Sequence, residues 1–226
     1  MLIVVEGLDG SGKSTQVRKL KEYLVSTGRG FEYLHFPRFD TPVYGDLLAR
    51  FLRGDLGSID HVHPRLVALL FAEDRRAAAP MLRKALDNGK IVLLDRYVYS
   101  NIAFQCAKLD DKDAREELRQ WIIELEYGIF GIPRPDLNIF LDVPVSVVSE
   151  RLGRTRKGSD REYLDGKDDI HESDMDFQSR VRNVYMEQCE LDKDFLRVDC
   201  SSDNGEMASP VSVFRKISAL LSERGL

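Results

Sequence analysis

The sequence predicts an α/β protein of three layers, in which a five-stranded parallel sheet lies between helices. Short apolar runs bounded by turn signals recur along the chain, and longer segments with helical spacing separate them. The runs are apolar at successive positions, as in strands that are covered on both faces of a parallel sheet. The five expected strands cover residues 2–5, 33–36, 91–94, 137–141 and 195–198.

The segments between these strands carry helical periodicity and helix boundary signals. Pro64 suits a first helical turn, whereas Pro80 is expected to kink or divide the long helix that contains it. The expected helices cover residues 14–27, 44–53, 64–88, 97–108, 113–126, 144–153, 174–192 and 210–223.

Composition predicts one domain without affinity for nucleic acid or membranes. The 226 residues are 43% hydrophobic, which suffices for one buried core, and a net charge of -5 offers no footprint for polyanions or anionic lipid. The three cysteines form no CxxC pair, which argues against a disulfide framework or a zinc site. The first residues lack the features of a signal peptide, so we expect a cytoplasmic protein.

A phosphate-binding motif follows the first expected strand. Residues 7–14 read GLDGSGKS, a complete GxxxxGK[ST] match, and a helix is expected to begin at once. Glycines let the backbone approach a phosphate, Lys13 supplies charge for the β and γ phosphates, and Ser14 is placed to bind the Mg²⁺ that accompanies ATP. The expected ATP-binding residues are Gly7, Leu8, Asp9, Gly10, Ser11, Gly12, Lys13, Ser14 and Thr15.

The end of the third expected strand indicates phosphoryl transfer between two anions. No NKxD motif of a GTPase occurs, and the strand ends in Asp95-Arg96-Tyr97 where a motor ATPase usually has Asp-Glu. Asp95 can hold the metal through water, and Arg96 can grip the phosphates of both substrates. The plain alternative is a surface pair that closes a strand.

Four motifs in register resemble those of thymidylate kinases. They are EGLD at residues 6–9, FPR at 36–38, LFAEDR at 70–75 and DRYVYS at 95–100, and the resemblance covers the chain to about Asp199. The resemblance implies the P-loop NTPase fold and a homodimer. It also implies transfer of the γ-phosphoryl group of ATP to dTMP, with Mg²⁺, giving ADP and dTDP for dTTP synthesis.

The resemblance also implies a set of acceptor-binding residues. Phe71 would stack on the thymine ring, Arg38 and Arg75 would hold the acceptor phosphate, and Asp9 would accept from the 3′-hydroxyl. Gln105 would read the pyrimidine edge, while Ser100 and Asn101 either assist with the base or cap a turn. The expected dTMP site comprises Asp9, Phe36, Arg38, Phe71, Arg75, Arg96, Ser100, Asn101 and Gln105.

A cationic segment is expected to act as a lid over residues 153–168. Some thymidylate kinases carry a catalytic arginine in the phosphate loop where this sequence has Gly10. In the bacterial type that the lid resembles, a lid arginine reaches the γ-phosphate instead. The candidates are Arg156, then Arg154, with Arg161 as a third, and together with Lys13 and Arg96 the first two form the expected catalytic set. A solubilising charged loop is the alternative.

Two other functions share parts of this pattern. A kinase for another small acceptor, such as a deoxynucleoside, adenylate, guanylate or cytidylate, would keep the phosphate loop but not the base site. A regulatory nucleotide-binding module would use the loop as a switch and would transfer nothing. Release of ADP that depends on the acceptor separates all three.

Overall fold

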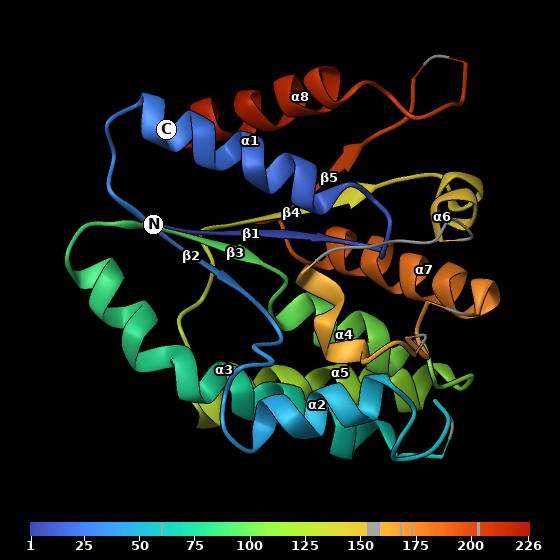
Figure 1. Ribbon diagram of the computed structural model, residues 1–226. Coiled ribbons are helices and arrows are strands. Elements are labelled where there is room, and N and C mark those ends of the chain that lie inside the picture. The colour runs from blue at the N-terminus through green and yellow to red at the C-terminus, as the bar shows by residue number, and fades with distance from the viewer. Residues whose placement is uncertain (60, 153–158, 168, 173, 203) are drawn as a thin grey trace.

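Five parallel strands form the centre of the protein in the computed structural model, which describes residues 1–59, 61–152, 159–167, 169–172, 174–202 and 204–226 (Figure 1). The strand order is β2-β3-β1-β4-β5, and every pairing is parallel. The predicted fold class is therefore confirmed. The strands are β1 (Leu2–Gly7), β2 (Phe31–His35), β3 (Ile91–Asp95), β4 (Leu137–Asp142) and β5 (Phe195–Asp199).

Burial explains why some strands give a clearer apolar pattern in the sequence than others. Every residue of β1, β3 and β4 is buried, because these strands occupy the middle of the sheet. The edge strands β2 and β5 are partly exposed and carry polar residues. The register places His35 beside Asp95 and Asp95 beside Val5, so the carboxyl ends of three strands meet at one edge.

Helices cover both faces of the sheet (Figure 1). On one face lie α1 (Lys13–Ser26) and α8 (Pro210–Glu223), and on the other α3 (Pro64–Asp87), α4 (Val98–Cys106) and α7 (Met175–Leu191). Outside this second layer, α2 (Tyr44–Leu52) packs on α3 and α5 (Lys112–Ile123) packs on α4. The chain also forms α6 (Val145–Leu152) and a short 3-10 helix, η2 (Ser159–Leu164).

Two helices differ from their sequence predictions. The long helix α3 runs undivided through Pro80, so of the two effects expected of this proline, a kink or a division, the division is wrong. Pro80 lies on an exposed position, where the carbonyl oxygen that loses its backbone partner is accessible to water. The helix expected to end at 126 ends at Ile123 and continues as a π-helical turn, η1 (Glu124–Ile129). Periodicity alone does not reveal this change of winding.

The described helices include none that is both long and apolar enough to cross a bilayer. Their apolar faces point inward instead, mostly onto a core built on β1, β3, β4 and β5, against which β2 packs. A second, smaller cluster of Phe51, Leu52 and Val67 lies between α2 and α3. Aromatic rings fill the space between β4, β5 and α7, where Phe140 stacks on Tyr185 with ring centroids 4.8 Å apart. This packing fixes α7 beside the carboxyl ends of the central strands.

Helix α2 approaches the segment after β2 through a glycine. A Cβ at Gly45 would lie 2.5 Å from the carbonyl oxygen of Phe39 and 2.8 Å from that of Arg38. Both neighbours are backbone atoms, which cannot swing aside as a flexible side chain can. Gly45 thus sets how closely α2 packs against the chain that leads into the site.

We expect Gly45→Ala to destabilise the protein, although alanine is the better helix former. The propensity gain of about 1 kcal/mol is outweighed by overpacking of roughly 3 kcal/mol, for a net loss of about 2 kcal/mol. Thermal unfolding should show a Tm lowered by about 4–8 °C. Ser222→Ala on exposed α8 is the control and should shift Tm by no more than about 2 °C. A Tm at or above that of the wild type would show that α2 is not held against this backbone.

Candidate active site

The phosphate loop connects β1 to α1 with glycines in left-handed backbone conformations. Gly10 has a φ of 76° and Gly12 a φ of 88°, values that residues other than glycine rarely adopt. Gly12 is the N-cap of α1, and among the described residues no side chain caps this helix end. The first N–H groups of α1 are therefore available to an anion, with the helix dipole behind them.

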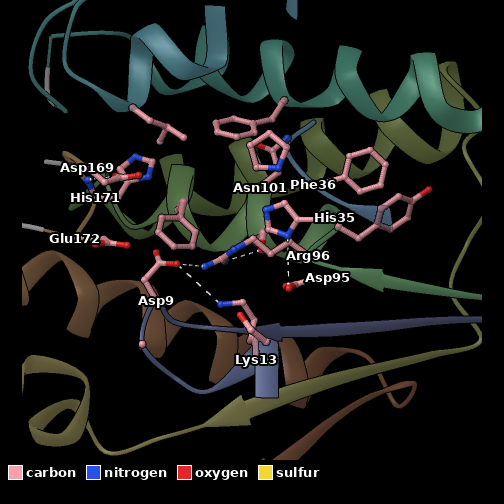
Figure 2. A pocket seen from close by; sticks show the side chains of 18 of the residues that line it. Asp9, Lys13, His35, Phe36, Asp95, Arg96, Asn101, Asp169, His171 and Glu172 are labelled. Atoms are coloured by element: carbon pink, nitrogen blue, oxygen red, sulfur yellow. Dashed lines mark hydrogen bonds and ion pairs between the residues drawn. The ribbon is translucent and has the colours of Figure 1, made fainter. Parts of the chain in front are cut away.

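Lys13 is held at the start of α1, with its ammonium group over the loop. Its Nζ donates to the carbonyl oxygens of Gly7 (3.2 Å) and Leu8 (3.0 Å) and lies 4.0 Å from Asp9 Oδ1 (Figure 2). Burial and then the charge of Arg96 lower the pKa of Lys13 to about 8. A bound polyphosphate would restore the missing negative charge and favour the ammonium form.

Asp95 ends β3 with one carboxylate oxygen open. Oδ2 lies 3.5 Å from His35 Nδ1, whereas the buried Oδ1 has no hydrogen-bond partner among the described residues. Burial works against ionisation, but His35, Lys13 and Arg96 together hold the pKa of Asp95 below its usual value.

The donors at this point fit Mg²⁺ that arrives with ATP. Asp95, which has one unpaired carboxylate oxygen, and Ser14 line the same cavity, and both offer hard oxygen donors. Within the described part of the chain, no group of three or more His, Cys, Asp or Glu residues could hold a metal alone. The set therefore suits an ion whose remaining ligands are phosphate oxygens and water.

Arg96 is the first residue after β3 and has a left-handed backbone, with a φ of 67°. Such a conformation is costly for a long side chain and persists only where several contacts enforce it. The backbone N–H of Arg96 donates to Val5 O (3.0 Å), and its guanidinium donates to Asp9 Oδ1 (2.6 Å) and Ser100 Oγ (3.0 Å). The outcome is a cation that projects into the cavity beside Lys13 (Figure 2).

The buried carboxylate of Glu6 ties β1 to the helix that follows Arg96. One oxygen accepts from the backbone N–H groups of Tyr97 (2.8 Å) and Ser100 (3.2 Å), which caps α4. The other accepts from the hydroxyls of Ser100 (2.5 Å) and Tyr185 (3.0 Å). Ser100 is thus bound by the carboxylate that caps α4, and its hydroxyl also supports Arg96.

A cavity of about 490 Å³ joins the phosphate loop to α3 and α4. This volume lies within the range of small-molecule sites. The cavity brings together most of the predicted site residues, whose roles remain predictions. Those lining it are Asp9, Gly10, Gly12, Lys13, Ser14, Thr15, Phe36, Phe71, Arg75, Asp95, Arg96, Ser100, Asn101 and Gln105.

Six predicted residues are not placed on this cavity. Gly7 and Leu8 support Lys13 through their carbonyl oxygens, and Ser11 is a buried residue of the loop. Arg38 lies nearby, with its guanidinium 5.7 Å from the Phe36 ring, but it is absent from the lining. The predicted lid arginines, Arg154 and Arg156, lie outside the described residues.

Both arginines predicted to hold the acceptor phosphate are paired with carboxylates. Arg38 donates from Nε to Asp74 Oδ1 (2.8 Å) and from Nη2 to the Asp74 carbonyl oxygen (2.7 Å). Arg75 is only 2% exposed, and its Nε and Nη2 both donate to Glu126. Neither guanidinium presents a whole unbalanced charge.

Comparison with known proteins identifies the family. The thymidylate kinase family model matches residues 5–209. The chain belongs to the thymidylate kinase family.

Thymidylate kinase of Mycobacterium tuberculosis is 35% identical over 83% of this chain and 85% of its own length. The Leifsonia xyli enzyme is 34% identical over 93% of this chain and 92% of its own length. The predicted resemblance to thymidylate kinases and the predicted class of ATP-dependent nucleoside monophosphate kinase are confirmed.

The likeness extends to eukaryotic members of the family and to the fold. Human thymidylate kinase is 35% identical over 66% of this chain and 64% of its own length. The solved structure of Candida albicans thymidylate kinase covers 99% of this chain and 92% of its own, with 26% identity and a TM-score of 0.76. Both the sequence and the three-dimensional arrangement are therefore those of this kinase family.

The thymidylate kinase cavity also contains residues that the sequence analysis missed. Asp169, His171 and Glu172 line one side of it, next to Asp9 (Figure 2). These residues follow the cationic segment, in a polar stretch whose sequence indicates an exposed loop. Asp169 and His171 are nevertheless buried. Arg151, from the end of α6, also lines the cavity and donates to the Gly10 carbonyl oxygen (2.9 Å). The only sequence signal was an excess of acidic residues after the segment.

Buried rings and a buried carboxyl group make this side of the kinase cavity unusual. His171 lies among Phe51, Phe104 and Phe177, with ring centroids 5.0–5.6 Å away, and burial lowers its pKa well below the usual value. Asp169 accepts from the hydroxyl of Tyr163 (2.7 Å). Burial, and then repulsion from Asp9, raise the pKa of Asp169 to about 7.

The raised pKa of Asp169 predicts a stability that falls as pH rises. The folded protein keeps its proton up to a pH of about 7, whereas the unfolded chain releases it near 3.8, so ionisation penalises the folded state across that window. Asp169→Asn should remove this dependence. Relative to the wild type, its free energy of unfolding should increase from pH 4 to pH 7 by on the order of a few kcal/mol and then stay level. Urea unfolding across this range measures the difference. Parallel curves for the two proteins would refute the assignment.

Proposed function

We propose that this chain transfers the γ-phosphoryl group of ATP to dTMP, giving ADP and dTDP. The observation that carries the proposal is the single cavity in which Lys13 and Arg96 face an aromatic and amide-lined end formed by α3 and α4. Membership of the thymidylate kinase family supports it. A phosphate loop alone would fit many nucleotide-binding proteins.

ATP is assigned to the phosphate loop, which comprises residues 7–15. The uncapped N-terminus of α1 and the Lys13 ammonium would hold its phosphates. Ser14 and Asp95 would hold Mg²⁺, the latter through water, and the metal would neutralise part of the phosphate charge. Asp95 is suited to this because its pKa is depressed and one of its oxygens is open.

The acceptor is assigned to the space between Phe36, Phe71 and Arg96. Phe71 offers the flat apolar surface on which a pyrimidine stacks. Asp9, fixed by Arg96, would accept from the 3′-hydroxyl, and Arg96 would hold the phosphate that it shares with ATP. Arg38 lies next to Phe36 and would contribute to the same phosphate with the part of its guanidinium that Asp74 leaves open.

The contacts favour a different partner for Arg75 from the one that the resemblance implies. Its charge is balanced by Glu126, so it is better matched to a neutral carbonyl oxygen than to a phosphate. We assign Arg75 to O4 of thymine, and Asn101, whose Oδ1 has no described partner, to the N3–H group. Gln105 lies in the same cavity with both amide atoms unpaired, and it would complete the contact with the base.

Transfer then needs no nucleophilic side chain. An oxygen of the dTMP phosphate attacks the γ-phosphorus of ATP, a new P–O bond forms, and the bond to the bridging β–γ oxygen breaks as ADP leaves. Lys13 and Arg96 would hold the two reactants in line and balance the charge that develops on the transferred group. We assign Arg156, and then Arg154, to the γ-phosphate.

The remaining predictions complete the proposal. The chain would act as one catalytic domain with a lid over residues 153–168, and as a homodimer in the cytoplasm. Its negative net charge agrees with small anionic substrates bound by local cations, without nucleic acid or membrane partners.

The choice of acceptor is tested by a panel of nucleoside monophosphates. With ATP and Mg²⁺, a coupled assay of ADP release should show dTMP as the best acceptor by kcat/KM, at least about tenfold above the cytidylate, adenylate and guanylate forms. A rate of ADP release that does not increase with any acceptor would indicate a regulatory nucleotide-binding module. Preference for another nucleotide would contradict the thymine assignment.

Two substitutions test the phosphate-binding cations. Lys13→Ala and Arg96→Ala should each lower kcat/KM by about 10²-fold or more, because each removes charge from the transferring group. Lys19→Ala on α1 and Arg50→Ala on α2 are controls of the same chemical type and should stay within about twofold. Circular dichroism verifies folding. Near-wild-type turnover in a folded Lys13 or Arg96 variant would contradict its proposed role.

A further inference from the structure

A π-helical turn carries a fully buried carboxylate to the acceptor end of the cavity. The turn η1 follows α5, and its Glu126 is 0% exposed. Extra winding of this kind is frequent at functional sites, since it re-aims one side chain within a helix.

Glu126 holds two of the cavity-lining residues at once. Its Oε1 accepts from Arg75 Nη2 (2.7 Å) and from Asn101 Nδ2 (3.0 Å), and its Oε2 accepts from Arg75 Nε (2.5 Å). Arg75 comes from α3 and Asn101 from α4, so one carboxylate sets the relation between two helices. Asn101 lies across Arg96 from Lys13, on the side of the cavity away from the phosphate loop (Figure 2).

This contact decides which way the Asn101 amide points. Nδ2 donates one hydrogen to Glu126 and the other to the carbonyl oxygen of Ala68 (3.0 Å). A reversed amide would place its oxygen against a carboxylate and a carbonyl group, which only accept hydrogen bonds. Oδ1, which has no described partner, is therefore the atom left for a ligand in the cavity.

Gln105, in contrast to Asn101, has no hydrogen bonds among the described residues that would fix the direction of its amide. It lines the same cavity and is 1% exposed, yet neither its Oε1 nor its Nε2 has a partner among the described residues. Its amide can present either a donor or an acceptor, so it adapts to either kind of pyrimidine edge. Discrimination between edges requires an amide of fixed direction, and Asn101 has one.

We propose that Glu126 is a positioning residue that sets base selectivity. It fixes Asn101 as an acceptor and Arg75 as a donor, a pair that matches N3–H and O4 of thymine or uracil. Cytosine presents an acceptor at N3 and a donor at C4, so both contacts with it would be repulsive. The inference rests on the proposed function, and it adds a residue that need not touch the substrate.

The test compares dTMP with 5-methyl-dCMP, two acceptors that differ only in the N3 and C4 groups. Wild-type enzyme should favour dTMP in kcat/KM by about 10²-fold or more. Glu126→Gln replaces one accepting oxygen by a donor, so Arg75 and Asn101 can no longer keep all three of their hydrogen bonds to this side chain. The ratio of the two kcat/KM values should fall at least about tenfold, chiefly through a higher KM for dTMP.

Glu126→Asp provides a second variant in case the glutamine variant folds poorly. It keeps the negative charge but withdraws it by one methylene group, so its selectivity ratio should lie between those of the wild type and Glu126→Gln. The control is Asp142→Asn, which alters a comparably buried carboxylate, bound by Arg182 and Arg197 at the end of β4. It should lower the Tm but leave the ratio unchanged.

The outcomes separate this inference from the proposed function. A wild-type enzyme that accepts 5-methyl-dCMP as well as dTMP would overturn the thymine assignment and the role of Glu126 together. Wild-type selectivity that is kept in a folded Glu126→Gln or Glu126→Asp variant would overturn the role of Glu126 alone. An equal loss of selectivity in Asp142→Asn would show that the ratio reports general stability, which would also overturn it.

Discussion

One buried carboxylate, that of Glu6, connects the sheet to the reactive end of the cavity. Glu6 is fully buried on β1, and its two oxygens accept hydrogen bonds from Tyr97, Ser100 and Tyr185. Burial raises its pKa, so the four hydrogen bonds to its carboxylate compensate a large desolvation cost. Because these bonds fix the start of α4, the positions of Arg96 and of every α4 residue in the cavity depend on this group.

The cavity illustrates how a protein holds several cations close together without excessive repulsion. Arg96 is paired with Asp9, Arg75 with Glu126, and Lys13 lies within reach of Asp9 and has a lowered pKa. Each pairing also fixes a direction, because guanidinium and carboxylate groups have planar, complementary donor and acceptor patterns. Positioning and charge balance are thus achieved by the same contacts.

The sequence predicted the sheet and the phosphate loop well because their signals are local. Wholly buried strands give continuous apolar runs, and the phosphate loop requires glycines at fixed positions. Residues that act through tertiary contacts were missed for the opposite reason. Glu126 appears as an ordinary acid of an amphipathic helix, and Asp169 as a loop acid, since neither burial nor a π-helical turn leaves a local pattern. Arg75 and Glu126 are 51 residues apart in the sequence, so no local sequence pattern indicated that they pair.

The left-handed backbone of Arg96 has a consequence for the evolution and engineering of this protein. With a φ of 67°, position 96 is one where glycine would be the least strained residue, yet a long cation occupies it. Local conformational preference and catalytic need therefore oppose each other at this residue. Searches for thermostable variants would tend to select replacements here that fold better and turn over worse, so position 96 should be kept constant when such libraries are designed.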